Sequence, residues 1–284
     1  MPGFTVPMEP ICDATFVAQM KKLPVDWKQP QGSPESGQYR DSFAPADHMA
    51  IPTPACYFWT QSTNKLHVES CKDIGTSFKE LAHDMLGGVK KAVNLWKTQA
   101  MFQNLQINAL TAGGAAGCLF GPPLKSNIKN FSRPAAAGNE AKWRDAIAGG
   151  VSDCFKAWQD KVTVPSLPWY PAFVAFPGPV GPPMPNVPTS LIGCASPAVG
   201  KMSPSSLKGA MMDHFGLDDP DDQFGALAQS IGTAVSAAFM AWLPTQLVMN
   251  VMATGPIPTW SPPVMPIGPV VAGINIAAPG HLSS

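Results

Sequence analysis

The sequence predicts a mainly α-helical protein with extensive irregular, extended proline-rich arms. Two observations predict this fold class: a helical pattern of apolar residues that occurs three times, and a proline-rich, nearly uncharged segment that follows each copy. Proline disrupts helix interiors and central strands, so the segments between the helices should be extended. We therefore expect three degenerate helix-plus-arm repeats, together with one small β-hairpin near the N-terminus.

Three stretches of the chain align without gaps, at 81–96, 143–158 and 227–242. Within each, apolar and small residues recur at the spacing i, i+3, i+4, i+7, i+8 and i+11, which is one face of an α-helix. Every copy ends in tryptophan. The recurring large residues, which we take as candidate packing or interface residues, are Val89, Trp96, Val151, Phe155, Trp158, Val235, Phe239 and Trp242.

Three copies in one chain suggest a pseudo-three-fold arrangement, with valine and tryptophan facing a common axis. Such an arrangement would match a symmetric oligomer, such as a trimer or a hexamer, as partner. The expected divisions are an irregular N-terminal region at 1–75, unit one at 76–138, unit two at 139–202 and unit three at 203–284.

Local signals place the ends of these helices. Ser77 with Glu80 forms a capping-box pattern before the first helix, and Asn139 is the candidate cap of the second. Asp221 or Asp222 is the candidate cap of the third, and a further short helix is expected around 204–212.

Each helix is followed by an apolar arm that contains a proline pair, and the last pair is Pro262-Pro263. An extended apolar segment that is not disordered must lie in a groove. We therefore count Pro262 and Pro263 among the candidate interface residues. In the N-terminal region, the run 55–68 has the apolar and turn residues of a hairpin.

Composition limits the possible partners. The formal net charge is zero, so no nucleic-acid partner is expected. Charged residues make up only 13% of the chain, roughly half the usual share. A surface with so little charge is poorly soluble by itself, so we expect much of it to be covered by a partner, by other copies or by lipid.

Sequence motifs for catalysis are absent. The chain contains no H-E-x-x-H, G-x-S-x-G, P-loop or G-x-G-x-x-G sequence, and we predict no catalytic, cofactor-binding or metal-ligating residue. The acidic run 218–222 could hold calcium, but acidic residues also gather at helix N-termini because the helix dipole favours them. An enzyme with an unrecognised site remains the less favoured class.

Six cysteines are spread along the chain without a C-x-x-C pair, as free buried thiols or as disulfides formed after release from a cell. The first ten residues do not form a signal peptide, so synthesis in the cytoplasm without export by that route is expected.

The stretch 227–253 is long enough to span a membrane. Pro244 interrupts it, and the matching helices of units one and two carry charges that a bilayer would not accept. A membrane partner is therefore possible but less favoured.

The arm at 254–273, with its G-P-x-P, P-P and P-x-G-P pattern and the Pro279-Gly280-His281 close, resembles structural proteins of tailed phages and contractile injection particles. The resemblance implies a minor particle component in the baseplate, the neck or the capsid surface, located in the virion and bound to other particle proteins. Our expectation is thus a non-enzymatic assembly protein that joins subunits through its arms. The alternative is a membrane-active or membrane-anchored protein that uses unit three.

Overall fold

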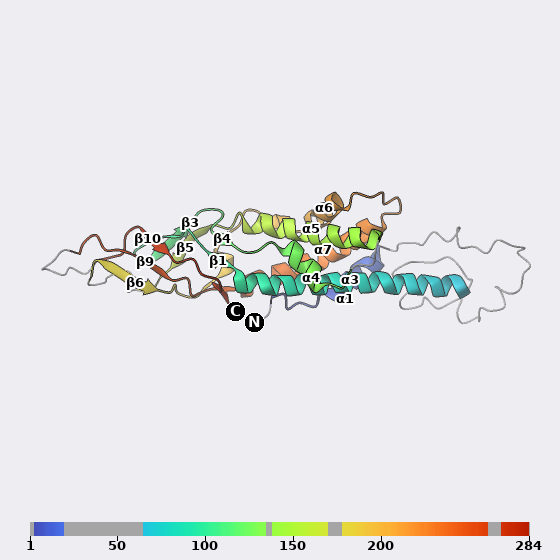
Figure 1. Cartoon of the computed structure of the whole chain (residues 1–284), viewed down its shortest axis with the longest axis horizontal. Helices are drawn as coiled ribbons and strands as arrows, with labels where there is room; N and C mark the ends of the chain where they lie inside the picture. The colour runs from blue at the N-terminus through green and yellow to red at the C-terminus, as the bar shows by residue number, and fades with distance from the viewer. Residues whose placement is uncertain (1–2, 20–64, 135–137, 170–177, 261–267, 284) are drawn as a thin grey trace, which may run out of the picture.

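The computed structural model describes residues 3–19, 65–134, 138–169, 178–260 and 268–283. Among these residues, the helices gather in one half of an elongated molecule and the strands gather in the other (Figure 1). We call these parts the helical half and the β half. Apolar side chains of both halves belong to one continuous buried core.

The helical half holds six α-helices in the described residues: α1 (Met8–Ala18), α3 (Lys65–Gln99), α4 (Leu124–Phe131), α5 (Asn139–Gln159), α6 (Pro204–Phe215) and α7 (Gln223–Trp242). Helix α6 packs against both α5 and α7, α1 packs on α7, and α4 lies between α3 and α5. The three aligned stretches of the sequence fall within α3, α5 and α7.

The β half corrects the predicted fold class, because the proline-rich arms are not only irregular. They form a six-stranded antiparallel sheet with the order β5-β3-β2-β10-β9-β6. Its strands are β2 (Gln106–Asn108), β3 (Thr111–Gly114), β5 (Val164–Pro168), β6 (Val180–Met184), β9 (Ala253–Pro256) and β10 (Gly273–Asn275). The protein is therefore a mixed helix and sheet fold, and the prediction of a mainly α-helical protein is wrong.

Four shorter strands lie in the chain between strands of this sheet and the helices: β1 (Met101–Phe102), β4 (Leu119–Phe120), β7 (Thr189–Ser190) and β8 (Leu247–Val248). A fifth, β11 (Leu282–Ser283), follows β10. Strand β1 pairs with β4, and β8 pairs with both β7 and β11.

Strand pairing in the six-stranded sheet links the three units in a cycle. Unit one supplies β2 and β3, unit two supplies β5 and β6, and unit three supplies β9 and β10. In each case the second strand of one unit pairs with the first strand of the next: β3 with β5, β6 with β9, and β10 with β2. A bridge between Trp169 and Asn186, just beyond the ends of β5 and β6, joins the two outer strands.

Small residues keep the strands of this sheet close together. A Cβ atom on Gly255 would lie 2.4 Å from the Gly273 Cα and 2.7 Å from a methyl group of Val270. A Cβ atom on Gly181 would lie 2.9 Å from the other methyl group of the same valine, which is fully buried. Glycine is therefore required where Val270 fills the space between neighbouring strands.

Prolines within the strands explain why the sequence pattern did not indicate a sheet in these arms. Strand β6 contains Pro182 and Pro183, and β5 contains Pro165 and Pro168. Proline cannot donate a ladder hydrogen bond, so it is tolerated at outer strands where no donor is needed. Strands β5 and β6 are the two outer strands of the sheet order, which explains how these arms form strands at all.

The predicted N-terminal hairpin at 55–68 is also wrong where it can be seen. Residues 66–68 are helical, because α3 begins at Lys65, while residues 55–64 lie outside the described part of the chain. The region at 1–75 further contains α1, whose buried side chains Met8, Cys12 and Phe16 recur at helical spacing.

Two of the three predicted helix starts differ from the structure. Ser77 lies inside α3, so it caps nothing, and α5 has Gly138 as its N-cap residue. Asp222 does occupy the N-cap position of α7, but Asp219 supplies the hydrogen bonds, since its carboxylate accepts from the amides of Gln223 and Gly225 at 2.8 and 2.9 Å. The short helix expected around 204–212 is confirmed as α6, which starts with Ser203 as its cap.

Candidate interaction surface

The three repeat tryptophans meet at the ends of α3, α5 and α7. Ring centroids of Trp96, Trp158 and Trp242 are 6.1, 6.3 and 6.3 Å apart, and each ring is at most 1% exposed. The indole N–H of Trp96 donates a 2.7 Å hydrogen bond to the side-chain oxygen of Gln159. We call these three residues the Trp cluster, and it lies where the helical half joins the β half.

Phenylalanines from neighbouring helices surround the Trp cluster. Phe155 stands edge-on to Trp96 at 4.8 Å, and Phe239 stands edge-on to Trp158 at 5.1 Å. The corresponding place in α3 is Val93, and Trp242 instead meets Phe4 from the N-terminal segment at 5.9 Å. Edge-to-face contacts of this kind are favourable beyond the area they bury.

The other candidate residues divide into two groups. Val89, Val151 and Val235 are buried, so they lie in the core and are not available to a partner. Pro262 and Pro263 lie outside the described residues. The candidate residues that the structure describes therefore pack inside the protein, and an interaction surface must be sought elsewhere.

Charge is distributed very unevenly between the two halves. The segments 98–124, 162–200 and 223–284 contain no Asp, Glu, Lys or Arg, and all strands of the described chain lie within them. These segments are far apart in the sequence, but folding gathers their strands at one end of the molecule, whereas α7, which begins the third segment, belongs to the helical half (Figure 1).

Large apolar side chains are exposed on this uncharged surface. Ile274 of β10 is 64% exposed and Val180 of β6 is 54% exposed. All three units contribute, and the exposed residues of the β half are Leu110, Phe120, Val180, Ile192, Val271, Ile274 and Ile276. Scattered apolar residues are normal on protein surfaces, but here no charged side chain of the same segments separates them. We call these seven residues the apolar set.

Helix α7 together with the following turn, Gln223–Thr245, is long and apolar enough to cross a membrane. Most of its residues are buried, from Phe224 to Trp242, and it packs against α1 and α6. A core helix has the same composition, so its length does not by itself indicate a membrane span.

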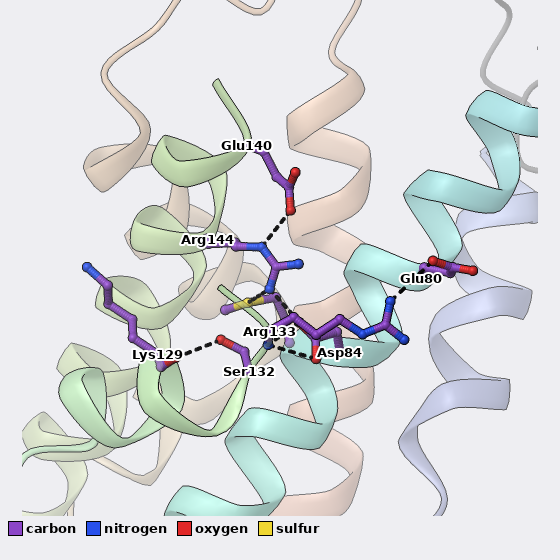
Figure 2. A network of polar contacts seen from close by, with 8 residues as sticks. Glu80, Asp84, Lys129, Ser132, Arg133, Glu140 and Arg144 are labelled. Atoms are coloured by element: carbon purple, nitrogen blue, oxygen red, sulfur yellow. Dashed lines mark hydrogen bonds and ion pairs between the residues drawn. The ribbon is translucent and has the colours of Figure 1, made fainter. Parts of the chain in front are cut away.

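A network of ion pairs and hydrogen bonds joins α3 to α5 and to the chain after α4 (Figure 2). The guanidinium of Arg144, 8% exposed, pairs with Asp84 of α3 and with Glu140 at 2.8 Å. Burial opposes the charge of Arg144, but the hydrogen bonds that its guanidinium donates to both carboxylates outweigh this effect, so the pKa of Arg144 is raised. Asp84 also accepts a hydrogen bond from the Arg133 amide at 2.9 Å. The network fixes α5 and the chain after α4 onto α3.

A cavity of about 600 Å³ opens beside this network. Its apolar wall includes Phe78 of α3 and Trp143 of α5, which meet edge-on at 5.1 Å, and its polar rim includes Glu80, Arg133 and Arg144. Both arginines are paired with carboxylates, Arg133 with Glu80 at 3.3 Å. The described residues of the lining include Asp73, Ser77 and Glu140 but neither histidine nor cysteine.

The cysteines of the described chain, Cys12, Cys118, Cys154 and Cys194, are buried and free. Burial raises the pKa of the Cys118 and Cys154 thiols to about 11 and that of Cys12 and Cys194 to about 12, so they are protonated and unreactive at neutral pH. Within the described residues, no three His, Cys, Asp or Glu side chains converge as metal ligands.

No family model, no curated protein and no solved structure matches this chain.

Proposed function

We propose that this chain is a non-enzymatic structural protein of a phage or phage-like particle, and that its β half joins neighbouring subunits. The observation that carries the proposal is the gathering of strands from three separate uncharged segments at one end of the molecule. Apolar side chains without neighbouring charges are the composition expected of a surface that is covered in an assembly.

The resemblance of the 254–273 segment to structural proteins of tailed phages supports a particle as the location. Strands from all three units pair in a cycle, so that each unit contributes two strands to the β half. A partner made of several identical subunits would meet such a surface with repeated contacts, so we propose a symmetric oligomer of particle proteins as the partner.

Incorporation into particles tests this function. Ile274→Lys places a charge on the most exposed side chain of the apolar set, and it should reduce the amount of protein that sediments with particles at least tenfold. Met240→Lys is the matched control, because Met240 is 55% exposed on α7 and should leave incorporation unchanged. Circular dichroism and thermal unfolding of both variants establish that they fold.

Two outcomes would contradict the proposal. One is a wild-type protein that never sediments with particles from the cells that make it, and the other is equal incorporation of Ile274→Lys and wild type. Floatation of the purified protein with liposomes, without particle association, would instead support the membrane-active alternative.

A further inference from the structure

A buried histidine close to the end of the described chain has an unusual hydrogen-bond environment. The His281 side chain is 1% exposed. Its Nδ1 accepts a 2.8 Å hydrogen bond from the amide of Phe102, so the ring proton must reside on Nε2. Among the described residues, Nε2 finds no hydrogen-bond partner.

The backbone around His281 joins the end of unit three to unit one. The Gly280 and His281 amides both donate to the Ala100 carbonyl, at 3.2 and 3.3 Å, and the His281 carbonyl accepts from Met249 at 3.0 Å. Immediately after it, β11 pairs with β8. The imidazole thus sits at the junction where the last strand meets both β1 and the chain that follows α7.

Among the described residues, the strands packed around this ring supply no carboxylate side chain that would compensate an added proton. Helix α3, which packs against β11, carries Lys97, a cation that is only 7% exposed. Strand β4, the partner of β1, follows Cys118, whose thiol is neutral because burial raises its pKa to about 11. The segments 98–124 and 223–284, which supply β1, β4, β8 and β11, contain no carboxylate side chain.

We propose that His281 is a pH-sensitive latch, which holds β11 against β1 and β8 near neutral pH and releases it in acid. Protonation of Nδ1 places an N–H opposite the Phe102 N–H, so the acceptor is lost and two donors face one another. The imidazolium then has no acceptor in its buried position and is better solvated when the last strand leaves.

The pH range follows from the two states of the ring. Burial lowers the pKa of His281 from 6.5 to about 4, whereas an imidazole released into water titrates near its ordinary value. The open state therefore binds more protons between these values. The equilibrium constant for opening rises as pH falls through this range, by up to about tenfold per pH unit, and is independent of this group above about 6.5 and below about 4.

Site-resolved amide hydrogen exchange of the full chain between pH 7 and pH 4 tests the latch. Protection factors are used because they are already corrected for the pH dependence of the chemical exchange step. The amides of Phe102, Met249 and His281 should lose protection by up to about tenfold per pH unit below 6.5. The amides of Ala109 and Trp169, which are hydrogen-bonded elsewhere in the β half, should keep theirs.

His281→Asn is the matched variant, since its side-chain oxygen can accept from the Phe102 amide but does not titrate. Its protection at Phe102 and Met249 should be flat over the same pH range. Protection that falls equally in both proteins, or that stays flat in the wild type, would overturn the proposal. If the variant does not fold, an NMR titration of His281 in the wild type decides, and titration near 6.5 without any loss of protection also overturns it.

Discussion

At the scale of single residues, the tryptophan at the end of each repeat helix packs against side chains of the other repeat helices as well as its own. Trp158 contacts Trp96 and Trp242 and also the edges of Phe155 and Phe239. One side chain therefore links α3, α5 and α7. Removing it leaves a cavity that three helices cannot easily close.

Trp158→Ala should lower the free energy of unfolding by about 3–5 kcal/mol, the range seen when large aromatic core residues are truncated. Urea denaturation followed by circular dichroism measures the change. Met240→Ala is the control, because Met240 is more than half exposed, and it should alter stability by less than about 0.5 kcal/mol. Equal losses in the two variants would show that the Trp cluster is not a core.

At the scale of elements, glycines determine how closely neighbouring helices approach. A Cβ atom on Gly88 of α3 would lie 2.9 Å from the carbonyl oxygen of Ile128 in α4. A Cβ atom on Gly150 of α5 would lie 2.5 Å from the amide nitrogen of Met211 in α6. Gly88 and Gly150 occupy the same place in the aligned stretches, and this place is small in both because another backbone lies against it.

Two neighbouring glycines of α3 provide a matched comparison. Gly87→Ala should stabilise the protein by about 0.5–1 kcal/mol, because nothing lies within 4 Å of the added Cβ and alanine favours helix. Gly88→Ala should destabilise it by about 1–3 kcal/mol, since α4 must move away. Thermal unfolding measures both changes, and the same sign for the two variants would contradict close packing of α4 on α3.

At the scale of the whole molecule, the three units cannot separate. Each unit pairs its strands with the other two, and the Trp cluster takes one residue from each. Most strand pairs of the β half thus join parts of the chain that are far apart in sequence. Folding should be cooperative across the described chain.

A fragment that ends at residue 202 should be largely unfolded, because it lacks β9 and β10, and with them one of the two partners of β2 and the sheet partner of β6. Circular dichroism and proton NMR of the fragment test this expectation. In the full chain, tryptophan fluorescence and far-ultraviolet circular dichroism should give the same unfolding midpoint, as two-state behaviour requires. A folded fragment, or two separate transitions, would show that the units are independent.

The sequence by itself determined the helices that carry the repeat. Helical periodicity is a local property, so the apolar face of 81–96, 143–158 and 227–242 could be read without knowing its neighbours. The start of α6 was equally local, since a serine cap followed by proline is a common helix start. The length of α3 and the presence of α1 were missed, because the polar and proline-rich sequence around them hides their periodicity.

Tertiary structure alone decided the sheet, the capping residue of α7 and the latch at His281. Prolines in the arms exclude most strand positions, and only the strand order shows that β5 and β6 lie where a missing donor is tolerated. Likewise, Asp219 caps α7 instead of the nearer Asp222, because the chain folds back before the helix. The absence of charge from each segment can be read from the sequence, but the arrangement of these segments in space cannot. Their strands form one uncharged end only because they pair with one another across the chain.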